Sequence, residues 1–264
     1  MLKKILNISL WVLLFGGFLT LLGFAEVKRN TTLCKAVDIR VMQNDTDFFI
    51  TPADVRDIVT HQQEGDPVGK PMDKISILHM EKMLAANPYV ADAQIYATLD
   101  GNIELKIRQR KPIVRIINAD DESYYLDSTG EVMPLSENFT ARTLVVNGHI
   151  NEPYSKYQGV SMKQMRDTSM HTALASIYKL ADYIYHNPFW KAQVTQVYLD
   201  SAKDFCLVPR VGDHRIIFGD TSDMEQKFNK LWVLYHEGLN STGKWNEYST
   251  INLKYKHQIV CTKN

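Results

Sequence analysis

The longest apolar run in the chain lies near its start, where residues 5–24 contain neither a charged residue nor a proline. A bilayer core of about 30 Å is crossed by about 20 helical residues at a rise of ~1.5 Å per residue. The run therefore predicts a transmembrane helix over residues 5–24. Lys3 and Lys4 precede it, and almost all of the chain follows it. We therefore expect residues 1–4 to be a cytoplasmic tail and the folded part to lie outside the cytoplasm.

A cleaved signal peptide is the alternative interpretation of this run. Gly23 and Ala25 place small residues at the spacing that precedes a cleavage site. Against this alternative, the run is longer than the 7–15 residues or so that are usual for the apolar part of a signal peptide. Both interpretations place the folded part outside the cytoplasm.

Beyond a polar linker predicted at residues 25–36, the hydrophobic pattern indicates a first compact unit over residues 37–112. Alternating apolar and polar positions predict strands. The boundaries of these helices and strands are marked by three signals: Thr and Pro at a helix start, Pro after a helix end, and Asp-Gly between two alternating stretches. The predicted order is strand, helix, helix, strand, strand, with both helices on one face of a three-stranded sheet. The strands are expected at residues 37–41, 89–97 and 103–107, and the helices from Thr51-Pro52 and from near Ser76 to Asn87.

Residues 113–264 follow as a second unit that is dominated by strand patterns, and the whole chain is therefore assigned to the α+β class. We expect a mixed α/β domain with a large, mostly antiparallel sheet, in which glycines such as Gly130 supply tight turns. Its strands are predicted at residues 113–117, on both sides of a tight turn at 127–130 within residues 124–132, and at 144–148, 194–199, 205–209, 215–219, about 248–255 and about 258–261. Its helices are predicted at about 168–186 and from Ser222-Asp223 through Tyr235.

Charge and cysteine content narrow the possible functions. Thirty basic and thirty acidic residues cancel, so the chain has no large positive field to attract nucleic acid. Apolar residues make up 45% and charged residues 23%, as in ordinary globular proteins. The three cysteines match no metal or redox spacing. A Cys206–Cys261 bridge is possible, but the sequence favours three unpaired thiols.

The sequence carries no pattern that points to catalysis. None of the eight histidines forms an HxH or HExxH pattern, and His236-Glu237 lacks a second ligand at helical spacing. There is no Gly-x-Ser-x-Gly nucleophile elbow, and the acidic cluster Asp120-Asp121-Glu122 falls in a predicted solvated turn. We therefore predict a protein that is not an enzyme, with no catalytic residues, no cofactor and no metal site.

Several motifs, in a consistent order, carry a family resemblance. In the first unit they are Asn87-Pro88-Tyr89-Val90 and the hairpin strand that ends in Arg110-Lys111-Pro112. In the second unit they are Tyr124 to Val132, Cys206 to Pro209, Arg215 to Gly219, Lys227 with Leu231, Tyr248, Ile251 to Tyr255, and Gln258 to Val260. Together they resemble the POTRA domain (polypeptide-transport-associated) and the C-terminal domain of the bacterial FtsQ/DivIB family. The departures are Leu144 where proline is common, Asn252 for Asp and Lys254 for Arg.

The resemblance implies a membrane-anchored cell-division scaffold that binds other divisome proteins and links or regulates septal wall synthesis. It implies a single-pass protein of the bacterial cytoplasmic (inner) membrane, with its N-terminus in the cytoplasm and its bulk in the periplasm. The C-terminal strand is expected to bind small single-pass division proteins of the FtsB/DivIC and FtsL type. The POTRA-like domain is expected to bind other divisome proteins. The alternative is a POTRA-bearing factor for protein transport or outer-membrane assembly. That alternative predicts several POTRA repeats or a C-terminal barrel, and neither pattern is found in the sequence.

The C-terminal end is the candidate binding site, because the chain finishes in a predicted strand. A last strand is often at a sheet edge, where unpaired N–H and C=O groups can accept a strand from another chain. Tyr255 is the first choice, since tyrosine combines apolar area with a hydrogen bond. The alternative is that about half of the candidate residues alternate inward and fill the core. By resemblance, the partner-binding residues are Tyr248, Ile251, Leu253, Tyr255, His257, Gln258 and Ile259.

Overall fold

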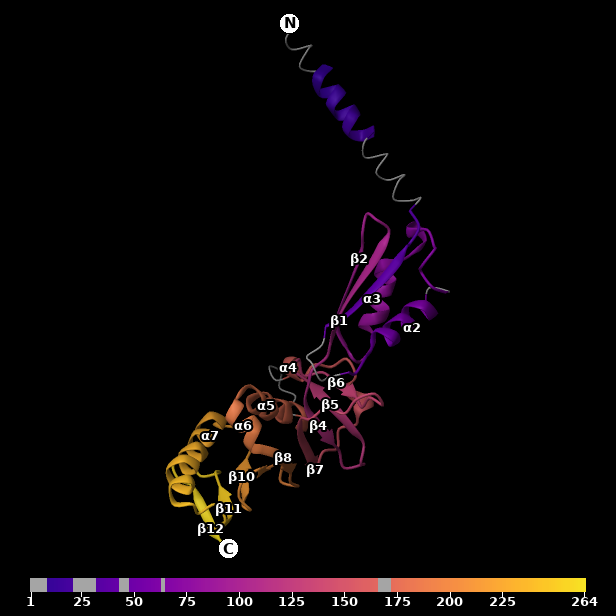
Figure 1. The fold of residues 1–264 in the computed structure, drawn as a ribbon. Coiled ribbons are helices and arrows are strands. Elements are labelled where there is room, and N and C mark those ends of the chain that lie inside the picture. The colour runs from indigo at the N-terminus through magenta and orange to yellow at the C-terminus, as the bar shows by residue number, and fades with distance from the viewer. Residues whose placement is uncertain (1–8, 21–31, 43–47, 63–64, 166–171) are drawn as a thin grey trace. The chain divides into compact units, whose positions relative to one another are not determined.

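The structure of the chain is a computed structural model that describes residues 9–20, 32–42, 48–62, 65–165 and 172–264 (Figure 1). Residues 9–20 are helical. No helix in this described part of the chain combines the length and the apolarity needed to cross a bilayer. Both ends of the predicted transmembrane helix, residues 5–8 and 21–24, lie outside the described residues, as do the predicted tail and most of the predicted linker.

The chain divides into two compact units, Met1–Gln109 and Arg110–Asn264. The first unit has the predicted order of elements, and a 3-10 turn at Met72–Lys74 is added between its helices. In its sheet β3 lies in the middle, parallel to β1 and antiparallel to β2. One apolar cluster joins both helices to the three strands, so both helices pack on one face, as predicted. The elements are β1 (Ala36–Met42), α2 (Pro52–Gln62), α3 (Ile77–Ala85), β2 (Val90–Ala97) and β3 (Asn102–Gln109).

Local side-chain contacts explain where the helices of this unit begin and end. The Thr51 hydroxyl accepts from the Asp54 N–H at 3.2 Å, and the Asp54 carboxylate accepts from the Thr51 N–H at 2.8 Å. This reciprocal pair satisfies two donors at the start of α2. After α3, the Asn87 side chain accepts from the Tyr89 N–H at 2.9 Å and turns the chain into β2.

The second unit is built on one nine-stranded mixed sheet in the order β12-β11-β10-β9-β8-β7-β4-β5-β6. The parallel pairs are β10–β11, β8–β7 and β7–β4, and the antiparallel pairs outnumber them, as predicted. The strands are β4 (Pro112–Ile117), β5 (Ser123–Asp127), β6 (Val132–Pro134), β7 (Leu144–Gly148), β8 (Val194–Leu199), β9 (Phe205–Pro209), β10 (Arg215–Gly219), β11 (Tyr248–Asn252) and β12 (Val260–Lys263). The helices are α4 (Met162–Met165), α5 (Ala173–His186), α6 (Pro188–Gln193) and α7 (Met224–Val233), with a 3-10 turn at Tyr154–Tyr157 and a π-helix at Leu234–Asn240.

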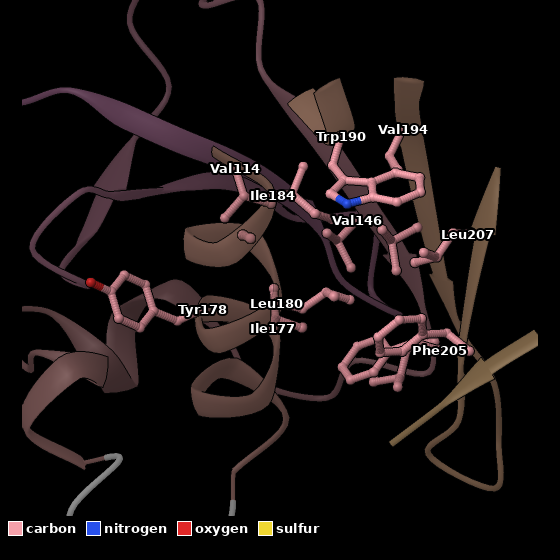
Figure 2. Close-up of a cluster of buried hydrophobic side chains, with 14 of the residues drawn as sticks. Val114, Val146, Ile177, Tyr178, Leu180, Ile184, Trp190, Val194, Phe205 and Leu207 are labelled. Atoms are coloured by element: carbon pink, nitrogen blue, oxygen red, sulfur yellow. The ribbon is translucent and has the colours of Figure 1, made fainter. Parts of the chain in front are cut away.

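The core of this unit lies between α5, α6 and the sheet. Figure 2 shows Ile177, Leu180 and Ile184 of α5 directed toward sheet residues such as Val146 and Leu207. These side chains are buried because α5 repeats its apolar positions at helical spacing. Tyr178 points to the other side of the helix (Figure 2), and its hydroxyl donates to the Ser128 carbonyl at 3.2 Å.

Three boundaries differ from the sequence-based expectation. The predicted helix at 168–186 is α5, which begins at Ala173 after the cap Thr172; residues 168–171 lie outside the described part. The predicted cap of α7 by Ser222-Asp223 is wrong, because Asp223 has a φ of 44° and makes no side-chain cap bond, while the Ser222 hydroxyl donates to Asp220. The strand predicted at 248–255 is shorter, since β11 ends at Asn252, and the strand predicted at 258–261 is shifted, since β12 covers Val260–Lys263.

All three cysteines are free thiols, as the sequence favoured. Burial is the main reason that the thiol pKa of Cys34, Cys206 and Cys261 is raised. A raised pKa lowers the thiolate fraction, and the thiolate is the reactive form. These cysteines therefore behave as small apolar residues.

Candidate functional site

The C-terminal strand β12 forms one edge of the nine-stranded sheet, as the sequence analysis expected of the last strand. It pairs antiparallel with β11, with Ile251 opposite Cys261 and Asn252 opposite Val260. In an antiparallel ladder, alternate residues direct their N–H and C=O groups away from the neighbouring strand. Because β12 has its neighbour on one side only, its alternate backbone groups face outward and can receive another strand.

Two of the predicted contact residues belong to the core. Ile251 and Leu253 are both 0% exposed and sit in the main apolar cluster. Ile251 lies on the face of β11 that covers that cluster, and Leu253, the first residue after β11, continues the same inward alternation. These two side chains therefore fill the core beneath the sheet edge, which is the alternative that the sequence analysis gave for about half of the candidate residues.

The other predicted residues lie at or near the surface. Tyr248 on β11 and Ile259 beside β12 are half-buried and pack against the core. Tyr255 is 49% exposed, and His257 and Gln258 are also exposed. Tyr255, His257 and Gln258 lie in the seven-residue connection between the strands, which we call the β11–β12 loop (residues 253–259). Tyr255 and Gln258 had been predicted to lie in strands, and that prediction is wrong.

A lysine that the sequence analysis did not single out reaches this loop from α7. The Lys230 ammonium donates to the carbonyl oxygens of Leu253 at 3.3 Å, Tyr255 at 2.6 Å and Gln258 at 3.5 Å. Burial lowers the pKa of Lys230, and the positive charge of Lys227 lowers it further. Lys227 is among the sequence motifs, and Lys230 follows it by three residues on the same helix. Residues at this spacing are neighbours on the helix surface, and this spacing was the sequence signal that could have indicated Lys230.

Charged pairs fix the chain on both sides of Lys230. Buried Lys227 donates to the Asp220 carboxylate and carbonyl, both at 2.9 Å. Hydrogen bonds from Ser222 and then from Lys227 hold the pKa of Asp220 at about 2, below the ordinary aspartate value. Lys254, in the loop, forms an ion pair with Asp204 at the start of β9. These residues surround a surface hollow of about 200 Å³ between α7 and the loop.

Both edge strands of the first unit are contacted by helix side chains. The Ile95 N–H on β2 donates to the Glu81 carboxylate of α3 at 3.1 Å. The Arg56 guanidinium of α2 donates to the Val37 carbonyl on β1 at 3.4 Å. A side chain that occupies a strand's outward group competes with the addition of another strand. The outward backbone of these edges is therefore less open to a partner than that of β12.

Two histidines of the second unit, His214 and His236, have packing roles. His214 is buried, and its Nε2 lies 2.7 Å from the Tyr235 hydroxyl. His236 stacks on Trp232 with ring centroids 4.1 Å apart. Within the described residues, no three His, Cys, Asp or Glu side chains gather in a way that could hold a metal ion. The chemistry that the candidate site itself offers is backbone hydrogen bonding along β12, framed by exposed polar and aromatic side chains of the loop.

Comparisons with known proteins match both units. The family model described as "FtsQ/DivIB, C-terminal related" matches residues 111–262, and a POTRA-like domain model matches residues 32–108. The chain is also similar to the protein named "Cell division protein DivIB" of Clostridium tetani (strain Massachusetts / E88), with 24% identity over 187 residues. That match covers 68% of this chain and 64% of the length of the relative.

Proposed function

Since this chain belongs to the FtsQ/DivIB-related family, we propose that it is a membrane-anchored scaffold of bacterial cell division. It binds other divisome proteins outside the cytoplasmic membrane and links or regulates septal wall synthesis. The apolar run at residues 5–24 is its proposed single-pass anchor in the cytoplasmic membrane, with residues 1–4 in the cytoplasm and the two folded units in the periplasm.

The observation that carries this proposal is the open edge of β12 at the end of the nine-stranded sheet. A partner strand that pairs with β12 gains backbone hydrogen bonds along its whole length without any new pocket. Membership of a cell-division family makes small single-pass division proteins of the FtsB/DivIC and FtsL type the proposed partners. The catalytic chemistry of wall synthesis then belongs to other proteins, since the proposed role of this chain is to hold them.

Side chains around β12 provide the proposed specificity. Tyr255, His257 and Gln258 project from the loop at one end of the strand, where they are exposed. Tyr248 and Ile259 offer their partly exposed atoms next to the same edge. Tyr255 combines apolar area with a hydroxyl, so it is the proposed main anchor of the contact.

The POTRA-like unit is proposed as a second docking surface for other divisome proteins. Its sheet leaves one face without helices, where polar residues such as Asp38, Arg40 and Gln94 are exposed. Since Glu81 and Arg56 already contact the edge strands, this charged face is the more accessible surface of the unit.

The proposal is tested by purifying the tagged full-length chain in detergent from its native membrane and identifying bound proteins by mass spectrometry. Proline, which lacks the N–H donor, is placed at Cys261 in one variant and at Thr262 in another. Because adjacent strand residues face opposite sides, one proline removes an outward donor and the other a donor to β11.

We expect small single-pass division proteins to co-purify with the wild type and to be lost from the folded variant with an outward-facing proline. Far-ultraviolet circular dichroism identifies which variant remains folded. Co-purification of outer-membrane assembly or transport proteins instead of division proteins would replace the scaffold proposal with a transport function. Recovery of division proteins that is unaffected by either proline would contradict the role of the β12 edge.

A further inference from the structure

The β11–β12 loop lacks the backbone hydrogen bonds that usually fix the connection between two paired strands. Leu253 still donates its N–H to the Ile217 carbonyl at 2.9 Å, and so continues the contact with β10. Lys256 and His257 form a turn within the loop, but among the described residues no backbone–backbone hydrogen bond joins residues 254–259 to β9, β10 or α7. Two-residue hairpin loops are fixed by their own turn geometry, but a longer loop depends on side chains for its shape.

Lys230 supplies much of what the backbone leaves out. An ammonium group has three N–H donors, and Lys230 has three carbonyl acceptors in the loop, from Leu253, Tyr255 and Gln258. These carbonyls come from the beginning, the middle and the end of the loop. A single charged group therefore holds the entire connection against α7.

Two side-chain contacts support the beginning of the loop. The Asn252 side chain accepts from the Lys254 N–H at 3.0 Å, and the Lys254 ammonium pairs with Asp204. Among the described residues, Lys230 is the side chain that donates to the carbonyls of Tyr255 and Gln258. The second half of the loop, which leads directly into β12, thus depends on Lys230.

We infer that Lys230 is a positioning residue for the C-terminal binding edge, because it fixes the loop that presents Tyr255 and sets the start of β12. The expected effect on partner affinity rests on the proposed function. The expected effect on the loop does not, because it concerns the free protein. When Lys230 is replaced by an apolar side chain, β12 keeps its ladder to β11, while the Tyr255 and Gln258 carbonyls lose their donor. The partner then has to order the loop on binding, which lowers affinity.

The effect on the loop is tested by amide hydrogen exchange of the full-length chain in detergent, with mass spectrometric detection. Lys230→Met is compared with Lys179→Met, because the Lys179 ammonium also donates to a backbone carbonyl, that of Thr221, at 3.1 Å. We expect Lys230→Met to increase exchange about tenfold or more at the hydrogen-bonded amides of the loop and its exit, which are those of Leu253 and Lys254 and the β12 amides paired with β11, since a hydrogen bond to a charged group is a strong one. Lys179→Met should leave exchange in this loop unchanged. Equal loop exchange in all three proteins would overturn the inference.

The effect on binding is tested with the extracytoplasmic fragment of the same organism's FtsB/DivIC-type protein as the probe. We expect Lys230→Met to weaken its affinity about tenfold and Lys179→Met to leave it unchanged. If Lys230 acts by positioning Tyr255, the loss of affinity caused by Lys230→Met must be smaller when Tyr255→Ala is already present, because the effects of residues that act together are not additive. Full additivity with Tyr255→Ala would contradict the positioning role.

The two experiments separate the inference from the proposed function. If the wild type fails to bind the probe, the proposed partner is wrong, and loop exchange alone decides the role of Lys230. If the wild type binds and Lys230→Met binds equally well, the proposed function stands and the positioning role for binding is wrong.

Discussion

The Arg110 guanidinium donates to the Asp127 carboxylate, with Nη1 and Oδ2 3.1 Å apart, and joins the first residue of the second unit to its first hairpin. The same nitrogen lies 2.6 Å from a carboxylate oxygen of Glu131. Asp127 is only 1% exposed, and its other oxygen accepts from the N–H groups of Thr129 and Glu131. Two motifs that are separate in the sequence, the basic residues before Pro112 and the turn after Tyr124-Tyr125-Leu126, therefore form one buried ionic contact.

Removal of Arg110 should destabilise the second unit strongly. Arg110→Met leaves the buried Asp127 carboxylate without its cation, and the expected loss is about 3 kcal/mol in the free energy of unfolding. Arg40→Met is the matched control, because Arg40 pairs with Asp38 on the surface. The control should change the free energy of unfolding little, because exposed ion pairs are screened by solvent; urea denaturation measures both variants. Similar losses in both variants would show that the Arg110 contact is no stronger than a surface pair.

Acid should destabilise the protein through His214. Burial lowers the pKa of His214, so the unfolded chain binds a proton more readily than the folded chain does. The free energy of unfolding should therefore fall as the pH decreases below about 6.5, the ordinary histidine value, and recover above it. His214→Gln carries no titrating ring and should weaken this pH dependence between pH 8 and pH 5, at some loss of stability at pH 8. Identical pH profiles for wild type and variant would contradict this assignment.

Gly148 should tolerate no side chain. Its φ is +111°, and a Cβ atom there would collide with the Leu199 carbonyl, which also accepts from the His149 N–H. Gly159 has a comparable positive φ of +71° but open space around it. Gly159→Ala should cost about 1–2 kcal/mol through backbone strain alone, and Gly148→Ala about 2 kcal/mol more through the collision. Equal thermal unfolding midpoints would show that the sheet adjusts to the added methyl group.

Glu81 should protect the Ile95 amide on the β2 edge from exchange. Glu81→Ala removes the acceptor, and we expect faster exchange at Ile95 and a loss of about 1 kcal/mol in stability. Glu81→Gln retains a carbonyl oxygen at the same position, so it should preserve most of the protection. Residue-resolved exchange by nuclear magnetic resonance measures both effects. Unchanged exchange at Ile95 in Glu81→Ala would mean that the contact is not formed in solution.

Elements with strong local signals could be predicted from the sequence. The first unit follows from alternation in its strands, the helix start at Thr51-Pro52, and Pro88 after α3. The helix α6 was missed, although Asn187 before Pro188 is a start signal and its side chain accepts from the Phe189 and Trp190 N–H groups. Its six residues are too few to produce a recognisable hydrophobic period.

The candidate site could be predicted only in outline. The edge position expected for the last strand is found in the sheet order, and the burial of Ile251 and Leu253 agrees with strand alternation. The role of Lys230 depends on how α7 packs over the β11–β12 loop, and no local pattern records that packing. The π-helix after α7 was also outside the reach of sequence reasoning, because its hydrogen-bond shift leaves the apolar spacing nearly helical.

The central claim is that a partner pairs its backbone with the open edge of β12. The most direct measurement is residue-resolved amide exchange at Val260–Lys263 in the free chain and in complex with the FtsB/DivIC-type fragment. Strand addition predicts slower exchange in the complex at alternate residues of β12, those whose N–H groups face away from β11, and little change at the residues between them. Unchanged exchange along β12 in a saturated complex, with protection gained at another surface, would contradict the account.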